Sequence, residues 1–253
     1  SEDGKVENAK ELRTIAYEHI PRIDYFLNTK INMVVADVKI SGKRIGYIEG
    51  AGDKVPSALQ QMGYEVVLLK EKDIVPAYLQ QYDAILTGVR AYDVHPWLSE
   101  KYEMLMEYIK EGGNLIVQYN RNNSNASGKI KIGPYPFTIA NVRVTDENAE
   151  VKFLKPDHAL LNYPNKISDK DFQGWVQERG IYFAGSPDAK YETVLSMHDA
   201  GEPEQQNSLI IGDYGKGKFV YTGLVFFREL PAGVPGAYRL MANIIALNKK
   251  KGF

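Results

Sequence analysis

The chain has 253 residues, with 31 Lys or Arg against 32 Asp or Glu, so its formal net charge is -1. This length can bury the core of one large domain. The balanced charge gives no global attraction for nucleic acid or for an anionic membrane, and neither is expected as a partner. The sequence contains no Cys, which excludes disulfides, thiolate metal sites and Cys nucleophiles. It also has no run of 18 apolar residues and a polar first segment, so we expect neither a transmembrane helix nor a signal peptide in it.

The first part of the chain is predicted to be connecting structure. Residues 1–30 begin polar and then read ELRTIAYEHIPRIDYFL, which predicts a short amphipathic helix that ends at Pro21, followed by an aromatic-rich connector. We interpret residues 1–30 as a linker or the tail of an upstream domain, and residues 31–253 as one α/β domain. At the start of that domain, the alternation in residues 31–44 predicts an edge strand.

The central feature of the sequence is residues 43–69, which contain one complete strand, turn, helix and second strand. The apolar run RIGYIEG leads into the loop Gly50–Asp53, Pro56 opens a helix, and Gly63 closes it. Apolar strands without polar alternation are typical of a parallel sheet covered on both faces, and ligands bind in the turns after their carboxyl ends. The loop Gly50–Asp53 is therefore a candidate site. The alternative is that its glycines only let the chain turn, because GAGD lacks the GxGxxG spacing of dinucleotide-binding folds.

Two further units repeat this spacing of strand and helix. A short helix is expected over residues 73–81, and a second helix begins with Ser99 as its N-cap and ends at a Gly-Gly pair. Together they predict a doubly wound, flavodoxin-like sheet, in which right-handed crossovers bring the loops 50–53, 87–95 and 119–123 to one edge. The four predicted parallel strands lie near residues 44–49, 64–69, 83–87 and 114–119.

The second half of the chain is less regular. Residues 121–208 are rich in Asn, Gly, Pro and Ser with short β-like pieces, which predicts an irregular β-rich insertion. The stretch NSLIIGDYGKGKFVYTGL then predicts an antiparallel hairpin that turns at Tyr214–Gly217. A final helix is expected over about residues 235–248. The predicted fold is thus a doubly wound α/β sheet with an insertion, a C-terminal hairpin and a helix.

The order GYIEGAGD, DAILTGVRAYD, GGNLIVQYN, PDHALL and YGKGKFVYTGL, followed by a helix, resembles the class I glutamine amidotransferase-like fold in its ThuA-like branch. More closely, the stretches from GYIEGAGDKVPSALQQMGYEVVLL to FFRELPAGVPGAYRL are similar to the C-terminal region of LmbE/PIG-L-type deacetylase proteins of Bacteroidetes bacteria. The likeness covers about residues 30–248. In those proteins a separate N-terminal domain carries the zinc deacetylase chemistry. The resemblance therefore implies a non-catalytic accessory domain whose partner is an upstream deacetylase domain of the same chain.

Two departures from these families limit the expected activity. Amidotransferases keep a Cys nucleophile in the sharp turn after the third strand, and here that turn reads GVRAY at residues 88–92. We therefore expect no glutaminase chemistry. The LmbE-type deacetylases bind zinc through an HPDD-like segment and a later HxxH pair, and neither motif is present, so no metal or other cofactor is expected. The remaining His and Asp neighbours are isolated in the sequence: Asp157-His158, His198-Asp199, and Asp93 with His95.

The polar residues that follow the predicted strands define a candidate ligand site. Asp53 follows the first strand, Arg90 and Tyr92 the third, and Asn120 the fourth, so all four are expected at the carboxyl edge of the sheet. Arg228 follows the last strand of the hairpin. In the insertion, the cluster GWVQERGIYF carries aromatic and bidentate groups that suit a sugar or another small polar ligand. The predicted ligand-binding residues are Asp53, Arg90, Tyr92, Asn120, Glu178, Arg179 and Arg228.

These residues leave two functions open. The first is a non-catalytic ligand-binding or interaction domain of a larger, carbohydrate-related deacetylase. The second is a hydrolase that acts on a carbohydrate or acyl substrate through Asp, Glu and His of the cleft. Convergence of Asp53, Glu178, His198 and Arg90 in one pocket would favour the hydrolase. A nucleophile at Ser196 beside His198 is a weak alternative, because no strained elbow exposes it. Each arginine can also serve only in an ion pair. The compartment is not fixed, and a periplasmic or extracellular full-length protein stays open.

Overall fold

The structure is a computed structural model, and it describes residues 10–28, 33–121 and 131–249. The chain divides into two compact units, Ser1–Val35 and Ala36–Phe253. Across the described residues, every helix is too short or too polar to cross a membrane.

The described part of the first unit is a two-stranded hairpin of β1 (Lys10–Ile15) and β2 (Ile23–Asn28). The predicted amphipathic helix is therefore wrong. The β-branched and aromatic residues of this segment favour a pleated pairing, in which Leu12 lies opposite Phe26. Pro21 falls in the connection between the strands instead of ending a helix. The sequence signal was a short apolar run, which periodicity alone does not assign to helix or strand.

The edge strand predicted for residues 31–44 is also not formed. Residues 33–43 are irregular, and the central sheet begins only at Arg44; residues 31 and 32 lie outside the described part. At Lys39 the backbone N–H and carbonyl form their hydrogen bonds with a side chain instead of a neighbouring strand. The N–H of Lys39 donates to Asn165 Oδ1, and the Nδ2 of Asn165 donates back to the Lys39 carbonyl, both at 2.8 Å. An amide side chain has one acceptor and two donors, so it can replace a strand partner at one residue.

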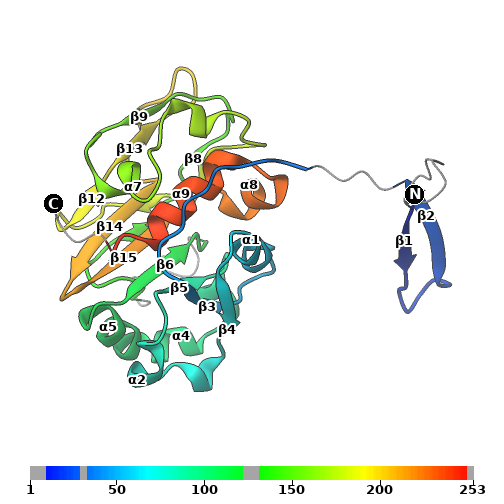
Figure 1. Cartoon of the computed structure of the whole chain (residues 1–253), viewed down its shortest axis with the longest axis horizontal. Helices are drawn as coiled ribbons and strands as arrows, with labels where there is room; N and C mark the ends of the chain where they lie inside the picture. Colours follow the sequence, from blue (N-terminus) through cyan, green and yellow to red (C-terminus); the bar gives the residue numbers. More distant parts are fainter. Residues whose placement is uncertain (1–9, 29–32, 122–130, 250–253) are drawn as a thin grey trace. The chain divides into compact units, whose positions relative to one another are not determined.

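A seven-stranded, mostly parallel sheet forms the centre of the second unit (Figure 1). In space its strands follow the order β4 (Glu65–Leu68), β3 (Arg44–Ile48), β5 (Ala84–Thr87), β6 (Asn114–Gln118), β15 (Gly217–Thr222), β14 (Leu209–Tyr214) and β12 (Tyr191–Thr193). The first five are parallel, and β14 pairs antiparallel with both β15 and β12. Numbered along the chain, the parallel strands have the flavodoxin-like order 2-1-3-4-5. The four strands predicted to be parallel are confirmed, and so is the antiparallel hairpin.

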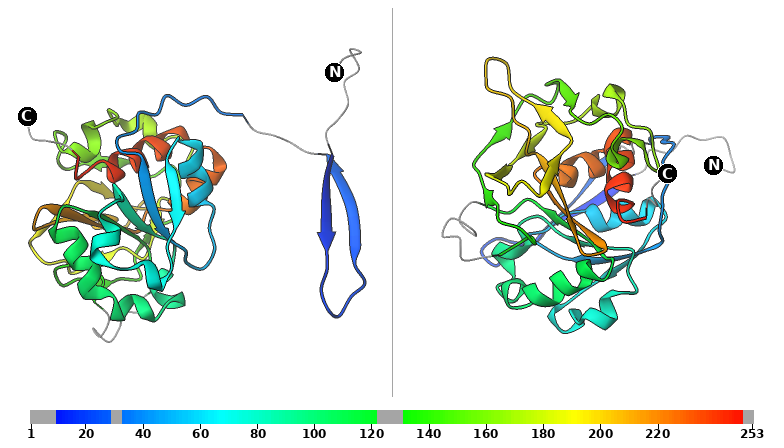
Figure 2. Two further views of the ribbon diagram at one scale, coloured as in Figure 1. Left: turned by 60° about the horizontal axis from the view of Figure 1, so that its bottom comes forward. Right: turned by 90° about the vertical axis from the view of Figure 1, so that its left-hand side faces the viewer.

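Helices cover both faces of this sheet, as the two views of Figure 2 show. One face carries α1 (Val55–Gln61), α8 (Phe226–Ala232) and α9 (Pro235–Ile245). The other carries α2 (Pro76–Leu79), α3 (Ala91–Val94), α4 (Trp97–Glu100) and α5 (Tyr102–Lys110). A 3₁₀ turn, η1 (Glu71–Asp73), precedes α2.

The structure corrects three helix boundaries. The helix predicted over residues 73–81 is reduced to η1 and the single turn of α2, because Pro76 lacks the N–H that a continuous helix would need. Ser99 lies inside α4, and Lys101 occupies the N-cap position of α5. The last helix ends at Ile245 instead of near residue 248. The short α8 was not predicted, because Pro231 and Gly233 made its segment look like a loop.

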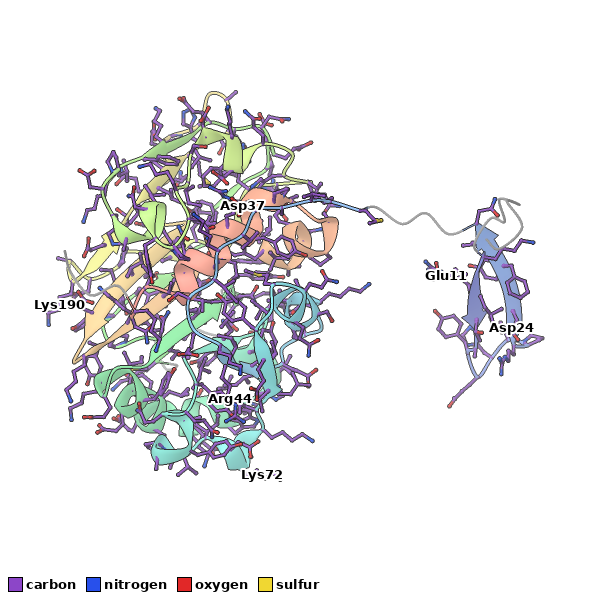
Figure 3. The ribbon with its side chains drawn as sticks, viewed as in Figure 1. Glu11, Asp24, Asp37, Arg44, Lys72 and Lys190 are labelled. Carbon is purple, nitrogen blue, oxygen red and sulfur yellow. The ribbon has the colours of Figure 1, made fainter. Side chains whose placement is uncertain are left out.

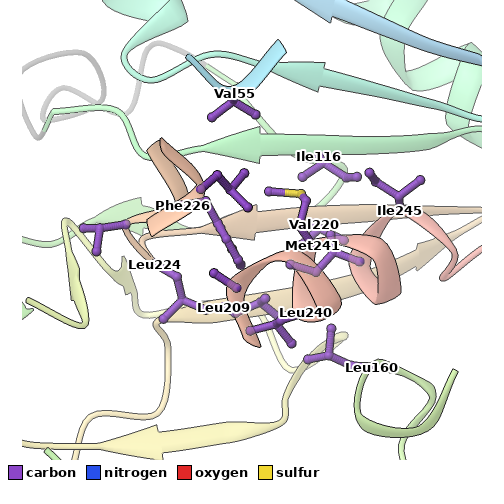
Figure 4. Close-up of a cluster of buried hydrophobic side chains, with 14 of the residues drawn as sticks. Val55, Ile116, Leu160, Leu209, Val220, Leu224, Phe226, Leu240, Met241 and Ile245 are labelled. Carbon is purple, nitrogen blue, oxygen red and sulfur yellow. The ribbon is translucent and has the colours of Figure 1, made fainter. Parts of the chain in front are cut away.

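The sheet separates two hydrophobic cores, and alternate residues of each strand feed one or the other. In β6, Ile116 packs with the core beneath α8 and α9, whereas Leu115 and Val117 pack with the core beneath α5. Figure 4 shows Leu240 and Met241 of α9 among the strand residues of the first core. Burial on both faces explains why the strands read as continuous apolar runs.

The insertion is built from short pieces, as predicted. Three small antiparallel pairs are formed by β7 (Thr138–Ile139) with β11 (Ala184–Gly185), β8 (Arg143–Val144) with β10 (Gly180–Ile181), and β9 (Val151–Phe153) with β13 (Leu195–Met197). A short helix, α7 (Ala159–Asn162), and a 3₁₀ turn, η2 (Asp169–Phe172), lie between them. The N–H of Ile181 donates to the carbonyl of Gly223 at 2.8 Å, which fixes the insertion to the loop after β15.

Candidate functional site

The turn after β5 is a sharp elbow with Arg90 at its tip. Arg90 has left-handed backbone angles, φ 58° and ψ 28°, and α3 begins at the next residue. Its N–H donates to the carbonyl of Tyr119 at 2.8 Å, so the elbow is fixed to the end of β6. This is the turn in which the resemblance places the Cys nucleophile of amidotransferases. Here the strained position presents a guanidinium instead.

The neighbouring loop after β3 is closed by backbone contacts. A Cβ on Gly50 would lie 2.1 Å from the carbonyl oxygen of Val89, and the N–H of Ala51 donates to that oxygen at 2.8 Å. The Asp53 carboxylate accepts hydrogen bonds from the Tyr47 hydroxyl at 2.8 and 2.9 Å and from the N–H groups of Val55 and Val89 at 3.0 and 3.2 Å. Of the two alternatives for Gly50–Asp53, the structure supports a loop whose glycine and carboxylate hold the chain together.

Beside the elbow, aromatic and guanidinium groups gather in what we call the carboxyl-edge cluster: Arg90, Tyr119, Tyr182, Phe227 and Arg228. The Tyr119 ring follows β6 and stacks on Tyr182, with ring centroids 5.6 Å apart, and it meets Phe227 at 5.4 Å. Desolvation raises the pKa of the Tyr119 hydroxyl, and the positive charges of Arg90 and Arg228 oppose that rise. Both guanidinium groups therefore act on one tyrosine that lies between them.

Two carboxylates balance the arginines of this cluster. Asp93 Oδ2 lies 3.3 Å from Arg90 Nε and 3.6 Å from Arg121 Nε, so one carboxylate serves two guanidinium groups. Glu178 Oε1 lies 3.2 Å from Arg228 Nε, and the Arg228 guanidinium also stands over the Phe227 ring at 5.0 Å. The carboxylates are the more enclosed partners. Asp93 and Glu178 are 13% and 12% exposed, whereas Arg90 and Arg228 are 32% and 37% exposed.

Backbone strain is concentrated at the same place. Among the described residues, four that are not glycine have a positive φ. Three of them belong to or contact the cluster: Arg90 with φ 58°, Tyr182 with φ 55°, and Gln177 with φ 70°, whose side chain accepts a hydrogen bond from Arg228. Such conformations cost free energy and persist where the surrounding structure enforces them, often at functional sites.

Three of the predicted ligand-binding residues are buried in the fold. Tyr92 and Asn120 are buried, and the Tyr92 N–H donates to Asn120 Oδ1 at 3.0 Å, which ties α3 to the end of β6. Arg179 is also buried, and its Nε and Nη2 donate to the Ala149 carbonyl at 3.1 and 2.8 Å. The Asn120 and Arg179 side chains satisfy polar groups that the fold buries, and Tyr92 is enclosed beside Asn120. The Asp53 carboxylate is likewise engaged in four hydrogen bonds within the fold.

Beneath the cluster lie two buried ionisable groups, Arg179 and Glu229. Burial lowers the pKa of Arg179 to about 10 and raises the pKa of Glu229 to about 7. The Glu229 carboxylate accepts the Val176 N–H at 3.0 and 3.2 Å, and Val176 begins the segment that carries Gln177 and Glu178. Glu229 therefore supports the side of the cluster that holds Arg228.

Of the predicted ligand residues, Arg90, Glu178 and Arg228 come together at this edge. Sequence reasoning did not select Tyr119 or Phe227. Tyr119 was overlooked because the polar Asn120 beside it looked like the better ligand residue, although the position directly after a buried strand is the one that faces the edge. Phe227 was overlooked because α8 itself was not predicted.

The groups that would favour a hydrolase do not converge. The His198 ring contacts residues close to it in the insertion. Its Nδ1 lies 2.8 Å from the Asp199 carbonyl oxygen, and its Nε2 lies 4.0 Å from Glu204 Oε1. The Ser196 hydroxyl donates to Glu204 instead of to His198. An acid between the serine and the histidine does not activate the serine as a nucleophile. Among the described residues, no group of three or more His, Asp or Glu is placed to hold a metal ion.

A separate pocket of about 430 Å³ opens between the start of α5 and residues 131–138. Its lining is mostly apolar and includes Tyr102, Tyr135 and Phe137. The Tyr102 hydroxyl donates to the Gly133 carbonyl at 3.2 Å and so forms part of its wall. None of the residues that line this pocket belongs to the carboxyl-edge cluster.

Comparisons with known proteins identify the fold of this chain. No protein-family model and no curated protein matches this chain. A protein from Bacteroides uniformis assigned as ThuA-like has 10% identity, covers 86% of this chain and 95% of its own, and superposes with a TM-score of 0.53. The chain has a class I glutamine amidotransferase-like fold. At this identity the likeness shows the fold alone.

Two further solved structures match with TM-scores below 0.5. One, from Thermoplasma acidophilum, is assigned as a GMP synthase subunit, with 11% identity, 83% of this chain and 95% of that chain covered, and a TM-score of 0.48. The other is a β-galactosidase of Rahnella sp. R3, with 14% identity, 82% of this chain and 31% of that chain covered, and a TM-score of 0.45.

Proposed function

We propose that this chain is a non-catalytic accessory domain that binds a small polar or sugar ligand at the carboxyl-edge cluster, within a larger LmbE-like, carbohydrate-related deacetylase. The observation that carries the binding role is Arg90 at the tip of the elbow. A guanidinium stays protonated and is no nucleophile, but it is a strong hydrogen-bond donor to hydroxyls and carboxylates. The upstream deacetylase domain is proposed from the sequence resemblance.

The contacts of the cluster suit ligand binding better than hydrolysis. General acid or base catalysis needs a carboxyl group free to exchange a proton with the substrate. Asp93 and Glu178 are instead held in ion pairs with arginines. Tyr119 and Phe227 are partly buried, and the ring surface that Tyr182 and Arg228 leave uncovered is where a sugar ring can pack, with the arginines beside it as donors to its polar groups. The hydrolase alternative has no comparable arrangement in the described part of the chain.

The binding role is tested by calorimetric titration of sugars and sugar acids into the protein and its Arg228→Ala variant. The matched control is Arg44→Ala, labelled in Figure 3. Arg44 is 36% exposed, pairs with Glu65 at 3.0 Å and stands over the Tyr82 ring at 5.3 Å, which closely reproduces the surroundings of Arg228 away from the cluster. We expect Arg228→Ala to weaken binding about tenfold or more and Arg44→Ala to leave it unchanged. Equal loss in both variants, or no loss in either, would contradict the assignment.

The accessory role makes a second prediction. The purified chain should leave glutamine and N-acetyl sugars unchanged, because the turn after β5 carries no Cys and the zinc-binding motifs are missing. Metal-dependent release of acetate that disappears in a His158→Ala or His198→Ala variant would overturn the non-catalytic role.

A further inference from the structure

The ion pairs of the carboxyl-edge cluster do not balance in charge. Asp93 is shared by Arg90 and Arg121, and Glu178 pairs with Arg228. Among the described residues, these ion pairs therefore join three guanidinium groups to two carboxylates, an excess of one positive charge. Of the two arginines that share Asp93, Arg121 is the more distant, with its Nε 3.6 Å from Asp93 Oδ2. Its side chain is 46% exposed.

The buried groups near the cluster carry charges of both signs, because Arg179 lies near the carboxylates of Glu229, Asp146 and Glu147. Arg179 keeps its positive charge at neutral pH, since its pKa, although lowered by burial, is still about 10. Glu229 is only partly ionised there, because burial raises its pKa to about 7. At the Tyr119 hydroxyl the positive charges of Arg90 and Arg228 act together, with Glu178 as the opposing carboxylate. A positive surplus next to partly enclosed aromatic faces attracts anions and disfavours cations.

The arginines can also accept a further partner. Arg90 and Arg228 are about one-third exposed, while the carboxylates that hold them lie deeper. Part of each guanidinium is therefore open to solvent, although Arg228 Nη1 already donates to the Gln177 side chain. A guanidinium can hold two carboxylates at once through its five donors, so a ligand carboxylate can bind without breaking either internal pair.

Resting on the proposed function, we propose that the ligand of the carboxyl-edge cluster is a monocarboxylate sugar acid of the uronic acid class. The sugar ring packs on the faces of Tyr119 and Phe227. Its carboxylate takes the positive charge that Asp93 and Glu178 leave uncompensated, through Arg228, Arg121 or Arg90.

The proposal is tested by calorimetric titration of four probes at low salt: D-galacturonate, D-galactose, D-galactosamine and acetate. Galacturonate should bind about tenfold or more tightly than galactose, since a charge-assisted hydrogen bond distinguishes them. Galactosamine should bind more weakly than galactose, and added NaCl should weaken the binding of the two carboxylates but not that of galactose. Acetate should bind more weakly than galacturonate, because it lacks the ring.

Results that contradict the sugar-acid assignment differ from results that contradict the binding function. Galactose binding as tightly as galacturonate would overturn the sugar-acid assignment and leave the binding function standing. Acetate binding as tightly as galacturonate would show that the ring contributes nothing and would also overturn it. Absence of binding by all four probes would overturn the proposed function itself.

A charge-removing variant gives an independent test. Glu178→Gln keeps the shape of the side chain but removes a negative charge beside Arg228, which would repel a ligand carboxylate. It should strengthen galacturonate binding several-fold, whereas a neutral sugar held by Glu178 would bind less tightly. The matched control is Glu65→Gln, which removes the same charge from the pair with Arg44 and should change nothing. Weaker galacturonate binding by Glu178→Gln, with unchanged thermal stability, would contradict the proposal.

Discussion

At the scale of single residues, Glu229 is a carboxyl group that the fold buries. Its side chain is fully buried in α8, and its carboxyl pKa is raised from an ordinary value of 4.5 to about 7, chiefly by desolvation. The protonated form is therefore favoured in the folded chain. Its contribution to stability is complete below pH 4.5, where the group is protonated in both states, and is lost as the pH rises through about 7.

This gives a prediction with a definite sign. The free energy of unfolding should fall between pH 5 and pH 7.5 by up to roughly 3 kcal/mol through Glu229. Glu229→Gln removes the titration but keeps an acceptor for the Val176 N–H, so its unfolding free energy should lack this part of the decline. Urea unfolding of both proteins at several pH values measures the difference. Parallel pH profiles for the two proteins would show that Glu229 does not titrate in this range.

At the scale of elements, the loops after β3 and β5 are joined by direct contact between their backbones. A methyl group at Gly50 would lie 2.1 Å from the Val89 carbonyl oxygen, whereas a methyl group at Gly52 meets nothing within 4 Å. Only the φ of 99° makes a side chain unfavourable at Gly52. Substitution of Gly50 therefore measures the free-energy cost of a clash between the two loops, and substitution of Gly52 measures the cost of a left-handed backbone conformation.

We therefore expect Gly50→Ala to lower the free energy of unfolding by about 3 kcal/mol, and Gly52→Ala by about 1 kcal/mol. Chemical denaturation of the two variants measures both values. Because the contact also positions the elbow, Gly50→Ala should weaken ligand binding at Arg90 as well. Similar small losses in both variants would mean that the loops can separate without cost.

A comparison of the predicted and observed helices and strands shows which parts of the fold the sequence predicts. The parallel strands were predicted because burial on both faces makes them continuous apolar runs, as in Leu115–Val117 of β6. The hairpin β1–β2 was not predicted, because a short segment of mixed apolar and polar residues has no clear hydrophobic periodicity. The placement of the loops after the parallel strands at one edge was predicted from right-handed crossovers. The helix α8 was not predicted, since its internal Pro231 made the segment look like a loop.

The candidate site was predictable only in outline. The rule that ligands bind at carboxyl ends of parallel strands places Arg90 and Arg228 at the edge. It does not distinguish a side chain that faces solvent from one that the fold uses internally. Tyr92 and Asn120 bond to each other, and Arg179 turns inward to the Ala149 carbonyl. Those outcomes depend on contacts between segments far apart in sequence, which one sequence does not reveal.

At the scale of the whole molecule, both hydrophobic cores are drawn from residues 45–247. A chain that begins at Ala36 keeps them, together with the bonds between Lys39 and Asn165. It should therefore fold cooperatively with a melting temperature within a few degrees of that of the full sequence. A chain that begins at Ser41 loses those bonds and should melt several degrees lower. Calorimetry of the two truncated chains checks both expectations, and failure of the longer one to fold would contradict the division into two units.

The central claim is that a sugar acid binds at the carboxyl-edge cluster of a glutamine amidotransferase-like fold that has an arginine at its elbow. The most direct measurement is the map of backbone amide shifts in a nitrogen-15 spectrum titrated with D-galacturonate. We predict that the perturbed amides lie in residues 88–94, 119–121, 177–182 and 225–229, and that Arg228→Ala abolishes their movement. Shifts confined to the pocket of residues 131–138, or a spectrum that does not change, would contradict the account.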